Sequence, residues 1–227
     1  MRRHPRRGEA GREVSLPSER GAEVGRRIGV GLMHGLWRPR VLGAWRVPAT
    51  GPAILAVNHS HNIDGPMVMG VAPRPTHFLI KKEAFVGPLG SFLTGIGQLE
   101  VDRHTTDRTA ITRALGVLDA GGVLGIFPEG TRGEGDFASL RAGLAYFAVR
   151  SGSPVVPVAV LGSSERRGRL MQGLPPLRSR IDVVFGDPFD AGDGSGRRTR
   201  RALDEATERI QKQLTAHLEN ARRLTGR

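Results

Sequence analysis

The chain has 227 residues, 38% of them hydrophobic, which is enough for one domain with a substantial core. Lys and Arg number 34 against 22 Asp and Glu, so the formal net charge is +12, and this excess favours a polyanionic partner, either nucleic acid or an anionic membrane surface. The absence of cysteine excludes disulfide bonds, thiolate metal sites and a cysteine nucleophile.

The first 45 residues contain a basic segment followed by a periodic one. Residues 1–20 carry arginines among Gly, Pro, Ser and Glu without apolar periodicity, so we expect a disordered basic tail. Within residues 21–45, apolar side chains recur at every fourth position beside two arginines, which predicts an N-terminal amphipathic helical element. The apolar stripe consists of Val24, Ile28, Leu32 and Leu36. Such a stripe suits a membrane interface and packing against a sheet equally well.

Residues 46–190 alternate short β-branched runs with helical patterns. Strands are predicted at residues 53–57, 76–80, 123–127, 155–160 and 181–185, and helices at 109–120 and 140–149. This order is typical of an α/β fold in which a mostly parallel central sheet is flanked by helices. Residues 191–227 are predicted to form a Gly-rich linker and a C-terminal amphipathic helix. The buried face of that helix would carry Leu203, Ala206, Ile210, Leu214 and Leu218.

A histidine and an aspartate stand five residues apart directly after the first predicted strand of this core. On a continuous helix, His59 and Asp64 would point about 140° apart and could not meet. They can meet if His59 lies in the loop and Asp64 in the first helical turn, where its carboxylate can hold one imidazole nitrogen and leave the other as a base. The pair alone is weak evidence, because the composition predicts roughly 0.3 chance matches to this spacing.

A second polar stretch follows the apolar run at residues 123–126. Residues 127–133, Phe-Pro-Glu-Gly-Thr-Arg-Gly, place a carboxylate, a turn, a hydroxyl and a guanidinium at the C-terminal end of a strand, where open α/β sheets bind ligands. The planar fork of Arg132 suits a phosphate. For Glu129 and Arg132 alone, an ion pair that closes the turn is an equally good interpretation.

Five features, in order and spacing, resemble the conserved blocks of the lysophospholipid and glycerol-3-phosphate acyltransferases. They are the pair His59 and Asp64, residues 81–83 (Lys-Lys-Glu), residues 97–103 (Gly-Gln-Leu-Glu-Val-Asp-Arg), residues 127–132, and residues 155–160 with Pro157. The resemblance covers about residues 54–189, and the Phe-Pro-Glu-Gly-Thr-Arg string is its most specific part. The chain departs from many members at His61, where Ser or Thr is common, and at Gly133, which is often Ser.

The resemblance implies that residues 46–190 form the catalytic core of an O-acyltransferase. Its donor would be acyl-CoA or acyl carrier protein loaded with a fatty acid, and its acceptor a lysophospholipid, with lysophosphatidic acid giving phosphatidic acid as the first expectation. His59 would remove the proton from the acceptor hydroxyl and Asp64 would orient His59, without a covalent enzyme intermediate. No metal and no cofactor are expected.

The resemblance also implies a set of residues that bind the acceptor. By position, Lys81, Arg103 and Arg132 would hold its phosphate, and Glu129 would position its glycerol part. The complete set of implied substrate-binding residues is Lys81, Arg103, Glu129, Gly130, Thr131 and Arg132.

Three alternatives stay open at this point. The enzyme could acylate another lyso-lipid by the same mechanism. A catalytically inactive, lipid-binding scaffold is a second alternative, although the loss of His59 or Asp64 would be its natural signature. A basic nucleic-acid-binding protein is a third, using arginines near residues 197–201, but with one Tyr and two Trp the aromatic side chains for base stacking are sparse, so no nucleic-acid partner is expected.

The expected location follows from the acceptor. A lyso-lipid does not leave the bilayer cheaply, because burial contributes roughly 0.8 kcal/mol per CH₂ group. The longest apolar stretches fall short of the roughly 20 residues that span a bilayer, and no apolar signal core follows the Arg-rich start. We therefore expect a cytoplasmic protein that is peripheral on the inner face of the cell membrane, with the anionic membrane surface as a partner.

Overall fold

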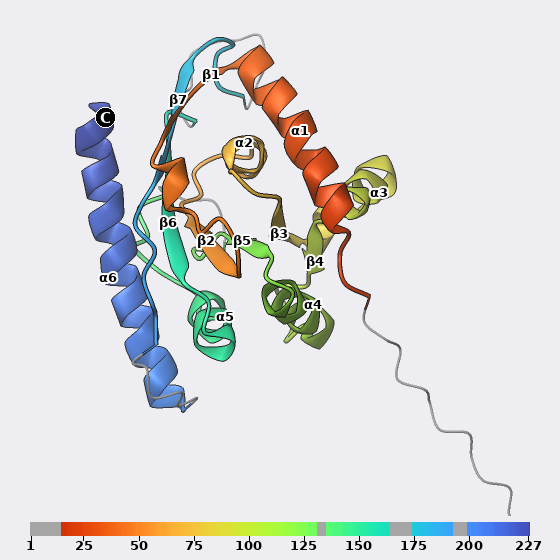
Figure 1. Ribbon diagram of the computed structural model, residues 1–227, viewed down its shortest axis with the longest axis vertical. Helices are drawn as coiled ribbons and strands as arrows, with labels where there is room; N and C mark the ends of the chain where they lie inside the picture. The colour runs from red at the N-terminus through yellow and green to blue at the C-terminus, as the bar shows by residue number, and fades with distance from the viewer. Residues whose placement is uncertain (1–14, 131–134, 164–173, 193–198) are drawn as a thin grey trace, which may run out of the picture.

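The computed structural model describes residues 15–130, 135–163, 174–192 and 199–227. Its centre is a seven-stranded sheet in the order β1-β7-β6-β2-β5-β3-β4 (Figure 1). The strands are β1 (Arg38–Leu42), β2 (Ala53–Val57), β3 (Thr76–Lys81), β4 (Leu99–Val101), β5 (Val123–Ile126), β6 (Val155–Leu161) and β7 (Arg180–Phe185). All neighbours pair in parallel except β6 and β7, which are antiparallel. The predicted α/β fold with a mostly parallel sheet is confirmed.

Helices cover both faces of the sheet. They are α1 (Glu19–Leu36), α2 (Asp64–Val71), α3 (Gly87–Gly95), α4 (Arg108–Asp119), α5 (Gly143–Ser151) and α6 (Arg200–Thr225), with short 3₁₀ turns η1 (Ala44–Arg46) and η2 (Lys82–Ala84). On β2, Ile54 and Ala56 belong to the apolar cluster shared with α4, α5 and α6, whereas Leu55 and Val57 belong to the cluster shared with α1 and α2. The fully buried strand β2 therefore separates two cores.

The N-terminal element differs from its predicted bounds. Residues 1–14 of the predicted tail lie outside the described residues, but α1 already begins at Glu19, because Ser18 caps it by accepting a hydrogen bond from the N–H of Gly21. The helix ends at Leu36, so the assignment of residues 38–42 to a helical element is wrong. These residues form the edge strand β1, which pairs with β7 and tolerates Pro39 at its position on the edge.

Helix α1 packs through a face other than its apolar stripe. The side chains of Val24, Ile28, Leu32 and Leu36 are 53%, 38%, 51% and 39% exposed. The buried face consists of Ala22, Gly25, Gly29 and Met33. A methyl group on Gly29 would lie 2.9 Å from the Cα of Gly70 in α2, so the two helix backbones touch at this point. The small residues, rather than the large apolar ones, make the helix-helix contact.

The C-terminal helix buries the predicted face. Ala206, Ile210, Leu214 and Leu218 are buried against the sheet side, and Leu203 near the helix start is half-buried. Residues 193–198 of the predicted linker lie outside the described residues, and Thr199 caps α6 by accepting a hydrogen bond from the N–H of Ala202. Among the residues that the structure describes, no helix combines the length and apolarity that a bilayer crossing needs.

Candidate active site

The site lies at one edge of the sheet, where neighbouring parallel strands end. Strand β2 pairs in parallel with both β5 and β6, and β3 extends the parallel set to β4. The carboxyl ends of these strands therefore bring together the loops that follow them, which is where such sheets bind ligands. The loop after β2 carries His59, the turn after β5 carries Glu129, and β3 and β4 lead to Lys81 and Arg103.

Asn58 fixes the start of the loop after β2. Its side chain is buried, donates to the carbonyl oxygens of Val160 and Gly135, and accepts a hydrogen bond from the N–H of Val160 at 2.7 Å. Only an amide side chain supplies both a donor and an acceptor in this arrangement. The residue before His59 is thereby attached to β6 and to the segment after the β5 turn. Asn58 was not among the site residues predicted from the sequence.

His59 and Asp64 meet in the arrangement that their spacing requires. His59 lies in the loop and Asp64 is the first residue of α2, with the Nδ1 of His59 3.3 Å from the Oδ2 of Asp64. The same Oδ2 accepts hydrogen bonds from the N–H groups of Ser60, at 2.8 Å, and His61, at 2.7 Å. The Asp64 side chain is fully buried. Its carboxylate is held by the main chain of the same loop that carries His59. Nε2 is then the imidazole nitrogen left for other contacts.

The other side of His59 is packed against the second motif. Its ring stacks on Phe127, with ring centroids 4.1 Å apart. His61, by contrast, takes part in the turn itself, because its Nδ1 lies 3.4 Å from the N–H of Ile63 and its own N–H binds Asp64. The ring of His59 is therefore fixed on both sides, while His61 caps the loop.

Glu129 also contacts the loop that carries His59. Its Oε1 lies 3.4 Å from the N–H of His59, and the N–H of Phe137 contributes a further hydrogen bond. Burial raises the pKa of Glu129 to about 7, and the nearby carboxylates of Asp136 and Asp64 act in the same direction. Arg132, the alternative partner of Glu129, lies outside the described residues together with Thr131.

The remaining predicted cations occupy different positions. Lys81 is exposed and lines the cavity that His59 lines. Arg103 lines the same cavity and donates a hydrogen bond to the carbonyl oxygen of Gly130. Gly130 has φ of +73°, a conformation that favours glycine, and the side chain of Arg141 lies close over it.

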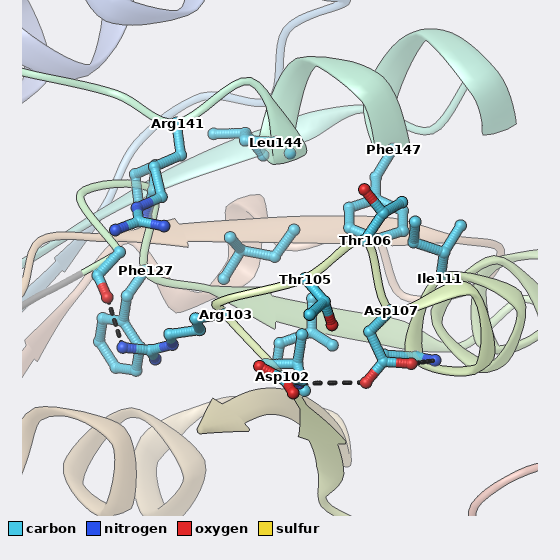
Figure 2. A pocket seen from close by; sticks show the side chains of 17 residues that line it. Asp102, Arg103, Thr105, Thr106, Asp107, Ile111, Phe127, Arg141, Leu144 and Phe147 are labelled. Atoms are coloured by element: carbon cyan, nitrogen blue, oxygen red, sulfur yellow. Dashed lines mark hydrogen bonds between the residues drawn. The ribbon is translucent and has the colours of Figure 1, made fainter. Parts of the chain in front are cut away.

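Two adjoining cavities open at these residues. The larger, of about 580 Å³, is lined by His59, Lys81, Arg103 and the exposed Leu89 of α3, among others. The smaller, of about 250 Å³, lies between the segment from β4 to α4 and helix α5 (Figure 2), where Ile111, Leu144 and Phe147 supply apolar walls. Both cavities share the lining residues Leu79, Arg103, Phe127 and Arg141. The arrangement suits an amphiphilic substrate with an anionic head and an apolar chain.

Sequence reasoning missed Arg141 and the apolar walls of the smaller cavity. Arg141 lies two residues before the first residue of helix α5, at a position where nothing local distinguishes it from a surface arginine. Ile111, Leu144 and Phe147 follow the ordinary pattern of helix faces. Within the described ranges, no group of three or more His, Asp or Glu side chains could hold a metal ion.

Comparisons with known proteins agree on one family. The sequence profile of the family described as Acyltransferase matches residues 38–161. A 1-acyl-sn-glycerol-3-phosphate acyltransferase of Bacillus subtilis (strain 168) is 28% identical over 183 residues, which cover 80% of this chain and 88% of that protein. A protein of the same name from Limnanthes alba is 33% identical over 116 residues, 49% of this chain and 41% of its own length.

The fold also has a counterpart among solved structures. The crystal structure of the 1-acyl-sn-glycerophosphate (LPA) acyltransferase, PlsC, from Thermotoga maritima superposes with a TM-score of 0.67 at 21% identity. The match covers 87% of this chain and 79% of that chain. At this identity, the similarity shows a shared fold.

Proposed function

The chain belongs to the acyltransferase family and is an enzyme of it, and from that premise we propose that it transfers a fatty acyl group from an acyl thioester to the free hydroxyl of a lysophospholipid, with lysophosphatidic acid as the first acceptor. The observation that carries the proposal is the imidazole of His59, held by a buried carboxylate at a cavity that has cations on one side and an apolar extension on the other. The names of the relatives support the choice of acceptor.

In the proposed reaction, His59 acts as the base. Its imidazole removes the proton from the acceptor hydroxyl, while Asp64 holds the ring and stabilises the imidazolium that forms. The hydroxyl oxygen attacks the thioester carbonyl carbon, so a C–O bond forms and the C–S bond breaks. The departing thiolate takes the proton from the imidazolium, and His59 returns to its neutral form. No covalent enzyme intermediate is required.

The acceptor phosphate is proposed to lie on the cationic side of the larger cavity. Lys81 and Arg103 line that cavity, and Arg132 belongs to the same proposed set. Glu129 remains our candidate for positioning the glycerol part, in addition to its contact with the main chain of His59. The turn at Gly130, together with Thr131, would shape this part of the site.

The donor is proposed to place its acyl chain in the smaller cavity. The apolar walls from α4 and α5 suit a chain of methylene groups, and each one buried contributes roughly 0.8 kcal/mol. The thioester carbonyl would then lie near Phe127, which lines both cavities and stacks on His59. Coenzyme A and acyl carrier protein both stay candidates for the donor's carrier, and no resident cofactor is proposed.

We place the enzyme on an anionic membrane surface, on the inner face of the cell membrane. Helix α1 lies beside α3 (Figure 1), since a methyl group on Gly25 of α1 would meet the side chain of Ile96, which follows α3 directly. Val86, Leu89 and Phe92, in and just before α3, are also exposed, and Leu89 lines the larger cavity. A lipid acceptor could thus enter the cavity without crossing water.

The decisive test is an acyl-transfer assay in mixed micelles. Radiolabelled long-chain acyl thioester, on coenzyme A in one series and on acyl carrier protein in another, is combined with lysophosphatidic acid. We expect the intact chain to form phosphatidic acid. In His59→Ala and in Asp64→Asn, the rate of its formation should fall by roughly two orders of magnitude or more. Asp119→Asn, an exposed aspartate at the end of α4, serves as the matched control.

Two results would change the conclusion. Transfer to a different lyso-lipid that still depends on His59 would keep the mechanism and replace the acceptor. Folded protein that transfers nothing to any lyso-lipid in a His59-dependent way would reject the enzymatic proposal for this chain and favour the lipid-binding scaffold.

A further inference from the structure

Arg141 stands beside the turn that follows β5. Its N–H donates a hydrogen bond to the carbonyl oxygen of Pro128 at 2.8 Å, which attaches the residue to that turn. Its guanidinium lies over Gly130, the residue whose carbonyl oxygen accepts the hydrogen bond from Arg103. In Figure 2, Arg141 and Arg103 extend from two different segments to the same end of the cavity. The turn at Gly130 thus lies between two guanidinium groups.

The side chain of Arg141 has no protein partner among the residues that the structure describes. Some other arginines of the described chain are held by protein groups. Arg74 donates to three carbonyl oxygens, Arg209 donates to two, and Arg227 pairs with Asp182. Arg141 instead lines both cavities of the site. Arg141 thus lies beside a second guanidinium group at a binding cavity and pairs with no carboxylate of the described chain. This arrangement suits an anion that binds from outside the protein.

We propose that Arg141 is a further binding residue for the acceptor and that it holds the phosphate of the lysophospholipid together with Arg103. The inference rests on the proposed function and adds a residue to its site. Two planar forks that approach from different elements can donate several parallel hydrogen bonds to a tetrahedral dianion. Arg103 and Arg141 both line the cavity that His59 lines, so an anion held by both lies in the same compartment as the base.

The phosphate ester could also belong to the donor's carrier, and kinetics separates the two sources. Initial rates are measured for Arg141→Gln, Arg141→Lys and the control Arg150→Gln, which changes an exposed arginine on α5 outside both cavities. We expect Arg141→Gln to raise the KM for lysophosphatidic acid by about 10- to 100-fold, with a smaller change in kcat and an unchanged KM for the thioester. Arg141→Lys should recover part of the loss, and Arg150→Gln should behave as the intact chain.

A binding measurement without catalysis completes the test. Glycerol 3-phosphate should raise the unfolding temperature of the intact chain and of Arg150→Gln, whereas it should raise that of Arg141→Gln much less, and glycerol should have no effect on any of them. An effect of Arg141→Gln on the KM of the thioester alone, or identical kinetics and stabilisation in Arg141→Gln and the intact chain, would overturn the proposal. If the intact chain transfers no acyl group but still binds glycerol 3-phosphate through Arg141, the anion site stands and the proposed function fails.

Discussion

At the scale of single residues, Asp64 performs two tasks with one oxygen. Its Oδ2 accepts hydrogen bonds from two main-chain N–H groups of the preceding loop and lies against the imidazole of His59. A carboxylate in the first turn of a helix is also favoured by the helix dipole. One carboxylate therefore holds both the loop and the imidazole of the base. The five-residue spacing between His59 and Asp64 allows this, because the chain turns between them.

Glu129 gives a prediction about pH and stability. Burial raises its folded-state pKa to about 7 from a usual value of 4.5. Between these values the folded chain keeps a proton that the unfolded chain has lost, so this residue makes the folded state less stable as pH rises from 4.5 to about 7. Glu129→Gln removes the titration and can still accept hydrogen bonds through its amide oxygen.

The measurement is the difference in unfolding temperature between the intact chain and Glu129→Gln across this range. We expect the intact chain to lose stability relative to the variant as pH increases from 4.5 to about 7, and the difference to become constant at higher pH. Glu100→Gln, at an exposed site on β4, is the control. A difference that does not vary with pH would show that Glu129 titrates in its ordinary range.

At the scale of elements, the two faces of α1 have opposite roles. The face with Gly25 and Gly29 lets the helix approach its neighbours closely, and the face with the larger apolar residues is left exposed. Helix amphipathicity normally predicts that the larger apolar side chains face the core. Here the close contact between α1 and α2 decides the orientation, because a side chain at Gly29 would meet the backbone of Gly70.

Two glycines of α1 provide a matched pair of substitutions. Gly29→Ala should destabilise the fold by about 1–3 kcal/mol, because its methyl group would lie 2.9 Å from the Cα of Gly70 and the two helices would have to separate. Gly31→Ala should stabilise it by up to about 1 kcal/mol, because no atom lies within 4 Å of its new methyl group and alanine favours the helix. Urea denaturation measures both. Equal effects of the two substitutions would contradict the packing of α1 on α2.

At the scale of the whole molecule, the exposed Leu89 of α3 lines the larger cavity, α1 carries further exposed apolar residues, and the chain carries a net charge of +12. Apolar side chains can enter the interfacial region of a bilayer, while the positive charge favours anionic lipids. An orientation in which α3 contacts the lipid would bring Leu89, and with it the larger cavity, to the membrane surface. The proposed membrane surface and the proposed acceptor therefore fit one placement of the molecule.

This placement predicts the behaviour of α1 variants with vesicles. The double substitution Ile28→Glu and Leu32→Glu should weaken binding to vesicles of phosphatidylcholine and phosphatidylglycerol by about tenfold or more, because charges replace apolar side chains at the interface. Its unfolding temperature should stay close to that of the intact chain, since both positions are exposed. Leu224→Glu, on α6, is the control, with a side chain that is 57% exposed. Unchanged flotation of the double variant with these vesicles would refute the role of α1.

The sequence by itself determined those features that short stretches of chain encode. Local sequence patterns predict the buried strands β2, β5 and β6 and the apolar face of α6. In each of them, the residues that the pattern marks as apolar are buried, with Leu203 of α6 half-buried. The loop arrangement of His59 and Asp64 was predictable for the same reason, since five residues leave few geometries in which the pair can meet.

Only the tertiary structure decided the features that depend on distant partners. Strand β1 exists through its pairing with β7, although Pro39 and its arginines give no strand pattern. The buried face of α1 was decided by how closely the backbone of α2 approaches it, a distance that no hydrophobic pattern contains. Arg141 joins Arg103 because the turn at Gly130 brings two separate segments together. In each case the deciding contact lies between residues far apart in the chain, and local preference carries no information about it.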